Sequence, residues 1–202
     1  MKDHQEPNWR PTGLIQTAFE IASHEHQDCV RKGAGIPYIS HLLAVSALVI
    51  EHGGTEVQAA AALLHDVLED TEVDEFMLRA LIDRPVVDIV VACSDTQKFP
   101  KPPWRERKEK YLKHLLEVLA EPEVDPVILV ALADKVHNAE TTSDMVLHKG
   151  KTAKEIYDNP NFNAKVDEQQ WWYESLVAEF RKSNVAPDLV DRLDRAVKAI
   201  FQ

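Results

Sequence analysis

The sequence predicts an all-α protein. Apolar side chains recur every three or four residues through most of the chain, which is the spacing of one helix face, and alternating apolar and polar runs are scarce. Apolar residues make up 45% of the 202 positions, which is enough to bury a hydrophobic core. We therefore expect a single domain over residues 1–202, with its core at about 14–182 and a closing helix at 186–201.

The first two helices are separated by the most turn-prone segment of the chain. Thr12 precedes an apolar pattern that predicts a helix running toward Arg31. The glycines and the proline of residues 33–37 then predict a turn. A second helix should begin near Tyr38 and reach about Glu51.

A third helix is predicted from about residue 56 to 68, because Thr55 with Gln58 fits a capping box. Residues 59–64 are all apolar, so this helix should be buried on most sides. The three prolines of residues 99–104 exclude regular helix there. The same helical spacing predicts further helices at about 73–82, 85–94, 104–119, 126–145, 166–181 and 186–201.

Composition and charge exclude several classes of protein. The formal net charge is −11, so no overall positive field attracts nucleic acid or an anionic membrane surface. The apolar runs are too short for a membrane-spanning helix, and the polar N-terminus lacks a signal-peptide core. With two cysteines only, we expect a reduced, cytoplasmic setting, and either a monomer or a homodimer fits the sequence.

Four ionisable residues follow the apolar part of the third predicted helix: His65, Asp66, Glu69 and Asp70. Charged side chains beside a buried helix need partners, and a bound cation can be one. Spacings of three and four residues place Asp66 and His65 on the same helix face as Glu69. Imidazole and carboxylate ligands suit a divalent metal such as Mn or Fe, with Zn possible. The alternative is that His65 and Asp66 only cap the helix or form salt bridges.

Two further residues could complete a metal site. His41 stands at the start of the preceding helix, and Asp134 ends the apolar run 130–134, where a buried carboxylate needs a strong partner. Together with His65 and Asp66 they would place two nitrogens and two oxygens around one ion. Coordination positions left for water and a substrate oxygen would make the site catalytic rather than structural.

Three blocks of the sequence resemble the HD-domain metal-dependent phosphohydrolases, and among these the RelA/SpoT-type hydrolase domains and the small alarmone hydrolases. The blocks are Arg31-Lys32 with residues 37–41, then residues 60–71, then residues 132–138. The resemblance spans about residues 14–182 and implies one helical bundle of about nine to ten helices. It also implies Mn²⁺-dependent hydrolysis of the 3′-pyrophosphate of guanosine tetra- or pentaphosphate (ppGpp or pppGpp), a small-molecule substrate, to GDP or GTP and pyrophosphate.

The resemblance assigns roles residue by residue. The metal ligands would be His41, His65, Asp66 and Asp134. Glu69 and Asp70 match the acidic pair that positions or activates the attacking water. The nucleotide contacts would be Arg31, Lys32 and Asn138.

A basic segment favours a polyanionic substrate without reference to the family. Seven basic residues and only two acidic ones lie from Lys98 to Lys113, in a chain that is acidic overall. The alternative is a solvated helix with ordinary Glu–Lys pairs. Residues 104–108 also resemble a segment of bacterial small alarmone hydrolases, which implies phosphate contacts by Lys101, Arg105 and Lys108.

The remaining histidines and aromatic residues have simpler interpretations. Three histidines are predicted at the surface or in turns: His24, His26 and His52. His114 is expected to be exposed, and as the only histidine between the His-Asp pair and Asp134 it favours one metal rather than two. His137 either packs in the core or supports the site. Residues 171–173 are expected to pack in the core or at an interface.

One position departs from the family pattern, because Glu140 stands where an arginine is common, two residues after Asn138. If that arginine binds phosphate, the substrate could instead be an adenosine alarmone or a 3′-phosphorylated nucleotide. An HD nucleotidase or phosphodiesterase is therefore one alternative function. A non-catalytic nucleotide-sensing module is another, although a degenerate relative would be expected to lose Glu69 and Asp70.

Overall fold

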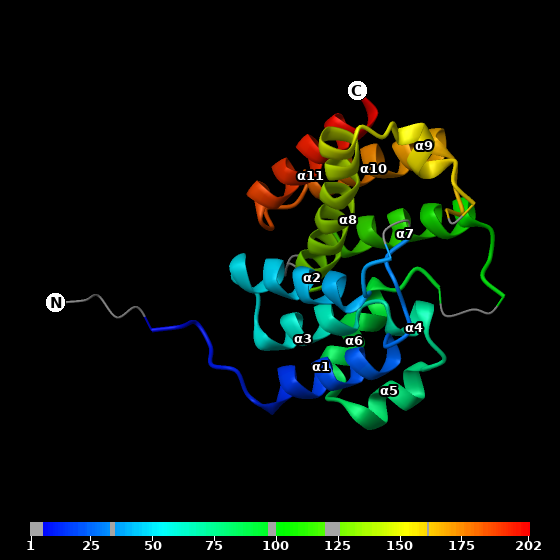
Figure 1. The fold of residues 1–202 in the computed structure, drawn as a ribbon. Coiled ribbons are helices and arrows are strands. Elements are labelled where there is room, and N and C mark those ends of the chain that lie inside the picture. Colours follow the sequence, from blue (N-terminus) through cyan, green and yellow to red (C-terminus); the bar gives the residue numbers. More distant parts are fainter. Residues whose placement is uncertain (1–5, 33–34, 97–99, 120–125, 161) are drawn as a thin grey trace.

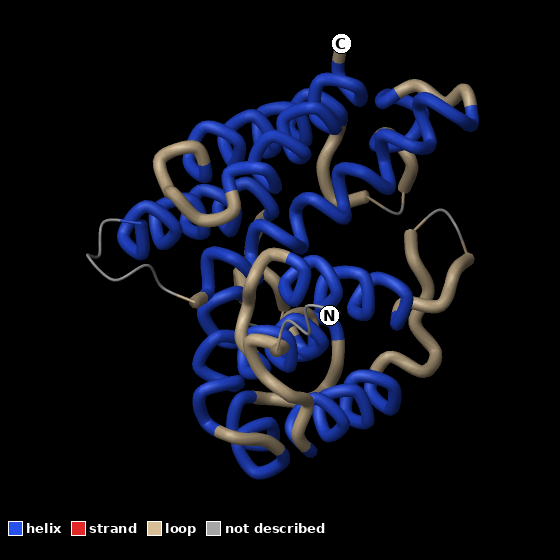
Figure 2. The backbone as a smooth tube through the Cα atoms, turned by 90° about the vertical axis from the view of Figure 1, so that its left-hand side faces the viewer, coloured by secondary structure: helices blue, strands red, loops and turns tan. Residues whose placement is uncertain are grey.

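The computed structural model describes residues 6–32, 35–96, 100–119, 126–160 and 162–202. Eleven α-helices and no strand occur in these ranges, so the predicted all-α class is confirmed (Figure 2). Lys98 of the basic segment, residue 99 and residues 33–34 of the predicted turn lie outside the described residues.

The N-terminal half contributes a layer of short helices around a central one. Its elements are α1 (Gly13–Glu25), α2 (Ile39–Glu51), α3 (Glu56–Leu64), α4 (Val67–Asp70), α5 (Glu75–Leu81) and α6 (Arg84–Cys93). The capping box of Thr55 and Gln58 starts α3 as predicted. Residues 59–64 are all buried, because α3 packs against α1, α2, α6 and α8.

The C-terminal half is organised around the longest helix. Its elements are α7 (Trp104–Leu119), α8 (Val127–Lys149), α9 (Ala153–Tyr157), α10 (Val166–Phe180) and α11 (Pro187–Phe201). The first half of α8 packs against the α2–α3 layer, and its length carries it up along α11 (Figure 1). The site described below lies where α2, α3 and α4 meet α8.

Buried apolar side chains from all eleven helices belong to one connected cluster. That one domain extends over all of residues 1–202 stays a prediction. None of the helices in the described ranges is both long enough and apolar enough to cross a lipid bilayer.

Two helix boundaries near the site differ from the prediction. The helix expected to run toward Arg31 ends at Glu25, because residues 27–28 are polar and exposed and offer no apolar face to bury. His26, which was predicted at the surface, is only 3% exposed, since it ends α1 and its ring packs 5.2 Å from that of Tyr38. The helix expected to reach residue 68 ends at Leu64, and His65 and Asp66 form a turn before α4.

Two further differences lie at the other end of the molecule. The α8 helix continues past the predicted end near residue 145 to Lys149, where Gly150 takes the left-handed conformation (φ 65°) that commonly ends a helix. The single-turn helix α9 was not predicted, although Thr152 and Glu155 form a capping box at its start. The helix is too short for a 3.6-residue period to be recognised.

Replacing Gly54 with alanine is expected to destabilise the protein. A Cβ atom there would lie 2.5 Å from Val49 Cγ1 and 2.7 Å from the Val49 carbonyl oxygen. That oxygen accepts the Gly54 N–H at 2.9 Å, so the backbone cannot move aside without losing this bond. We expect the free energy of unfolding, measured by urea denaturation, to fall by about 1–3 kcal/mol.

The matched control is Gly13→Ala, because no atom lies within 4 Å of a Cβ at Gly13. Gly13 is the first residue of α1, so alanine is expected to be neutral or slightly stabilising there. Equal losses of stability at the two positions would contradict the steric explanation.

Candidate metal centre

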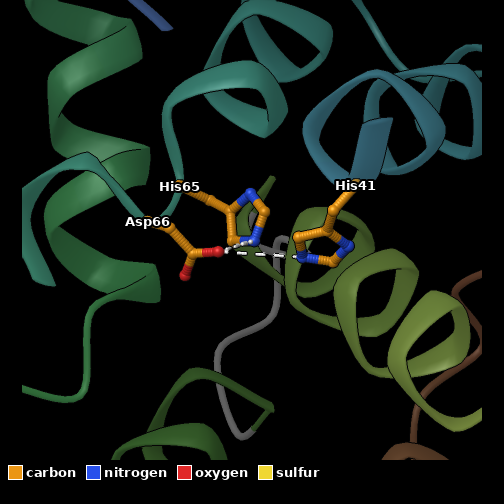
Figure 3. Close-up of side chains that lie close together, drawn as sticks. All are labelled: His41, His65 and Asp66. Carbon is orange, nitrogen blue, oxygen red and sulfur yellow. Dashed lines mark ion pairs between the residues drawn. The ribbon is translucent and has the colours of Figure 1, made fainter. Parts of the chain in front are cut away.

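Four side chains from three separate parts of the chain converge on one point. His41 comes from α2, His65 and Asp66 from the turn between α3 and α4, and Asp134 from α8. His41 Nε2 lies 3.2 Å from Asp134 Oδ1 and 3.7 Å from Asp66 Oδ2. His65 Nε2 lies 3.0 Å from Asp66 Oδ2 and 3.5 Å from Asp134 Oδ1. Figure 3 shows His41, His65 and Asp66 pointing toward one another.

These donor atoms fit a single divalent cation. Ligand atoms at about 2.1 Å from one ion are about 3.0–3.5 Å apart, which is close to the observed separations. The Nε2 atoms of His41 and His65 are buried and lie beside the Asp66 and Asp134 carboxylate oxygens, but neither nitrogen has a well-directed hydrogen bond among the described residues. A cation between the two nitrogens and the two carboxylates would bind all four groups.

In both histidines the other ring nitrogen, Nδ1, contacts a neighbouring group of the protein. His65 Nδ1 lies 2.8 Å from the Ala62 carbonyl oxygen, to which it donates, leaving Nε2 free to face the site. His41 Nδ1 lies 2.7 Å from Nδ1 of His137. His137 therefore contacts a residue of the cluster directly, which corresponds to the supporting role that the sequence left open.

The two carboxylates are also held in place by neighbouring groups. The Tyr38 hydroxyl donates to Asp66 Oδ2 at 2.5 Å. Asn138 Nδ2 donates to Asp134 Oδ1 at 2.6 Å, and the Lys135 ammonium forms an ion pair with Asp134 Oδ2. Such outer contacts fix the direction of a ligand's lone pairs before an ion arrives.

The electrostatics of the cluster also favour a cation. Burial alone would raise the pKa of Asp134, but Lys135 and His65 hold it well below its usual range. Burial lowers the pKa of His65, yet the adjacent Asp66 and Asp134 carboxylates raise it well above its ordinary value. The two carboxylates therefore attract positive charge to this point, and metal binding would replace the His65 proton.

The cluster opens into a cavity of about 720 Å³, which lies in the size range of small-molecule sites. Most of the predicted site residues line this cavity: Arg31, Lys32, Asp66, Glu69, Asp70, Lys108, Asp134 and Asn138. His41 and His65 lie behind its wall. Arg31 donates to Asn138 Oδ1 at 2.8 Å, which places the two predicted nucleotide contacts side by side.

A family model of the HD domain matches residues 18–158, which is more than half of the chain. The chain belongs to the HD-domain family. It is 34% identical over 137 residues to a probable guanosine-3′,5′-bis(diphosphate) 3′-pyrophosphohydrolase from Synechocystis, covering 68% of this chain and 18% of that relative. It is 31% identical over 132 residues to the bifunctional (p)ppGpp synthase/hydrolase SpoT of Escherichia coli K12, covering 65% of this chain and 18% of SpoT.

Solved structures show the same fold as this HD domain. A metazoan ortholog of SpoT, described as hydrolysing ppGpp, superposes with a TM-score of 0.73 at 23% identity, covering 94% of this chain and 97% of that one. The crystal structure of lmo0812 from Listeria monocytogenes superposes with a TM-score of 0.65 at 26% identity, covering 84% of this chain and 100% of that one. The chain spans only about a fifth of the length of the curated relatives.

HD domains depend on a metal, and within the described residues His41, His65 and Asp66 form a cluster that could hold one. Their ligand atoms all lie within 4.8 Å of one another. Asp134 adds a fourth donor through its contacts with both histidines.

The acidic pair of this HD domain occupies two different environments. Glu69 lies inside the cavity, where its Oε1 accepts the Asp95 backbone N–H at 2.9 Å. Burial, together with the charges of Asp95 and Asp66, raises the pKa of Glu69 to about 7. Asp70 is half exposed at the cavity edge, where its Oδ1 accepts from Lys101 Nζ at 2.9 Å. The raised pKa of Glu69 suits a proton acceptor near neutral pH.

Of the three lysine and arginine residues predicted to contact phosphate, only Lys108 lines the cavity. Lys101 lies outside the lining, paired with Asp70. Arg105 is exposed, with its guanidinium 3.3 Å from the centroid of the Trp171 ring and its Nε 2.7 Å from Glu109 Oε1. As expected, Trp172 and Tyr173 are buried and His114 is exposed.

Sequence reasoning missed several residues around the site. Tyr38 and Lys135 belong to the same motifs as predicted ligands, three residues before His41 and directly after Asp134, and these positions could have indicated them. Asp95 gave no such signal, because a single acid after a helix is an ordinary feature. Its buried ion-pair partner Arg107 was indicated only as one of the seven basic residues from Lys98 to Lys113. Trp172 and Tyr173 were expected in the core, and they also line the cavity.

Glu140 of this HD domain lies outside the cavity lining. Both of its carboxylate oxygens accept from Arg192 of α11, each at 2.8 Å. Two residues of helix turn a side chain by about 200°, so Glu140 points away from the cavity that Asn138 lines. Glu140, which stands where an arginine is common in the family, therefore forms an ion pair that joins α8 to α11.

Proposed function

We propose that this chain is a divalent-metal-dependent hydrolase that removes the 3′-pyrophosphate from ppGpp or pppGpp. The observation that carries the proposal is the convergence of His41, His65, Asp66 and Asp134 at the wall of a nucleotide-sized cavity. Membership of the HD-domain family and the activities named for the relatives from Synechocystis and Escherichia coli support the choice of substrate.

The four converging side chains would hold the ion, which we propose to be Mn²⁺, with Fe²⁺ or Zn²⁺ as alternatives. Such an ion supplies Lewis acidity, which lowers the pKa of water and offsets negative charge on phosphoryl oxygens. The open face of the cluster toward the cavity is where the phosphate and water have access.

The chain's own residues would carry the proton transfer. Glu69 accepts the proton of the attacking water through Oε2, since its Oε1 already accepts the Asp95 N–H. The water oxygen bonds to the phosphorus attached to the 3′ oxygen, and the bond between that phosphorus and the 3′ oxygen breaks. The proton that Glu69 accepted is given up, directly or through solvent, to the 3′ oxygen, which yields GDP or GTP and pyrophosphate and restores the Glu69 carboxylate. Asp70 would position the water from the cavity edge.

The substrate would be held by positively charged and polar side chains. Lys108 and Lys32 line the cavity and would neutralise the phosphates, while Arg31 with Asn138 would contact the nucleoside. Lys101 and Arg105 would contact phosphate only if the bound substrate extends beyond the residues that line the cavity.

The deciding experiment is incubation with ppGpp and Mn²⁺, with and without a chelator, followed by product analysis by ion-exchange chromatography. We expect GDP and pyrophosphate, and no turnover with the chelator. Release of orthophosphate, or faster turnover of the adenosine analogue, would favour another HD nucleotidase or phosphodiesterase. Tight binding without any product would favour the nucleotide-sensing module.

The rate of hydrolysis is expected to fall as the pH is lowered through about 7. Burial and neighbouring carboxylates raise the pKa of Glu69 to about 7, and a proton acceptor works only when deprotonated. A cation in the cluster would lower this pKa, so the acid limb should lie at or below pH 7. The measurement is kcat against pH with Mn²⁺ saturating; a limb that persists unchanged in Glu69→Gln belongs to another group.

Substituting Glu140 by glutamine is expected to leave KM and kcat for ppGpp within about twofold of the parent. The side chain contacts Arg192 rather than the cavity, so only the ion pair between α8 and α11 is lost. Both partners are about one-third exposed, so the loss of stability should be below about 1 kcal/mol. The measurement is steady-state kinetics of this variant and of Asn138→Ala, which changes a cavity residue on the same helix. A KM raised equally by both would place Glu140 at the substrate.

A further inference from the structure

Asp95 is a buried carboxylate that none of the roles above uses. It follows α6, its side chain is only 2% exposed, and it was not among the residues that the sequence indicated. Its Oδ2 accepts from Lys108 Nζ at 2.8 Å and forms an ion pair with Arg107. Its backbone N–H donates to Glu69 Oε1 at 2.9 Å. A buried charge needs such partners, because desolvation is costly.

The two cations that meet Asp95 have different surroundings. Arg107 is 7% exposed and its Nε donates to the Pro102 carbonyl oxygen, so its guanidinium is committed to the start of α7. Lys108 lines the cavity, with its Nζ 4.8 Å from the centroid of the Trp172 ring. Since Arg107 alone would balance the charge of Asp95, the ammonium of Lys108 is a second positive charge, which lies at the cavity wall beside Glu69.

We propose that Asp95 is a positioning residue, which holds the Lys108 ammonium toward the reacting phosphates while its backbone holds Glu69 beside them. Without Asp95, the four-carbon side chain of Lys108 is free to adopt other rotamers, and placing it at each binding event costs entropy. The aromatic face of Trp172 limits the ammonium on the other side. One residue thus sets the separation between the proposed proton acceptor, held by its backbone N–H, and the proposed phosphate contact, held by its carboxylate. This inference rests on the proposed function.

The main test is Asp95→Asn, which keeps the shape of the side chain and the backbone N–H to Glu69 but removes the charge that holds Lys108. We expect KM for ppGpp to rise about tenfold, with kcat reduced less, because a charge-assisted phosphate contact is weakened. The affinity for inorganic pyrophosphate, measured by calorimetry without turnover, should fall by a similar factor. Asp88→Asn is the matched control, since it loses ion pairs to Arg79 and Arg84 on the exposed face of α6 and should change neither value.

A double-mutant cycle with Lys108→Met separates positioning from a general structural role. If Asp95 acts through Lys108, the double variant binds pyrophosphate no more weakly than Lys108→Met alone. Additive losses would overturn the proposal, as would a KM and a pyrophosphate affinity within twofold of the parent in folded Asp95→Asn. If Asp95→Asn does not fold, Asp95→Glu carries the test, because it keeps the charge but displaces Lys108 and should raise KM several-fold; an unchanged KM overturns the proposal.

The outcome is distinguishable from a failure of the proposed function. If the parent protein does not release pyrophosphate from ppGpp, the proposed reaction is wrong. Pyrophosphate binding by the parent, Asp95→Asn and Lys108→Met would still show whether Asp95 positions a phosphate-binding lysine.

Discussion

Asp66→Ala is expected to abolish metal binding and hydrolysis together. Asp66 Oδ2 lies within 3.0 Å of His65 Nε2 and 3.7 Å of His41 Nε2, so its loss removes one of four donors and leaves two buried imidazoles beside a single carboxylate. A metal ion contributes several kcal/mol to phosphoryl transfer, so kcat/KM should fall by about 1,000-fold or more. Calorimetric titration with Mn²⁺ and the rate of pyrophosphate release from ppGpp are the two measurements.

The control for this change is Asp70→Ala. Asp70 also carries a carboxylate and stands four residues away, but its side chain pairs with Lys101 at the cavity edge. This variant should retain Mn²⁺ binding. If Asp66→Ala bound Mn²⁺ as tightly as Asp70→Ala does, the assignment of the metal centre would fail.

Glu69→Gln is expected to keep the metal and the substrate but to slow hydrolysis by about 100- to 10,000-fold, which is the usual contribution of a general base. Glutamine has the shape of the native side chain, and its amide oxygen can still accept the Asp95 N–H. The change removes only the ability to take a proton. We expect unchanged Mn²⁺ affinity, a dissociation constant for ppGpp within about threefold, and a much lower kcat in single-turnover experiments.

The two variants therefore separate holding the metal from moving the proton. A Glu69→Gln protein as active as the parent would show that another group accepts the proton. A variant that also lost Mn²⁺ would show that Glu69 belongs to the metal centre instead. Asp70→Ala serves again for comparison, because the Asp70 carboxylate is half exposed and pairs with Lys101.

Most of the fold could be predicted from local patterns. Apolar spacing and the Thr55–Gln58 capping box indicated the helices, because both depend on residues within one or two turns of each other. The end of α3 at Leu64 could not be predicted this way, since the residues after it continue an acceptable helical pattern. The turn at His65 and Asp66 is stabilised by contacts with α2 and α8, which are distant in sequence.

The candidate site was predicted unevenly for the same reason. His41, His65, Asp66 and Asp134 stood out because charged or polar side chains in apolar helices require partners. The three predicted phosphate contacts near α7 did not stand out from one another: Arg105 lies on Trp171, Lys101 pairs with Asp70, and of the three only Lys108 reaches the cavity. Lys101 precedes α7, and Arg105 and Lys108 lie about one turn apart on it, so sequence spacing does not separate them. The contact of Lys101 with Asp70 of α4 and the packing of α7 against α10 distinguish them.

The sequence by itself determined that the chain is helical and which histidines and aspartates stand in apolar surroundings, because these properties depend on neighbouring residues. Tertiary structure decided that Asp95 joins Lys108 and Glu69, that Glu140 binds Arg192, and that His26 is buried. Each of these contacts depends on the distance and direction between helices. That geometry follows from how the whole core packs, which no short stretch of sequence specifies.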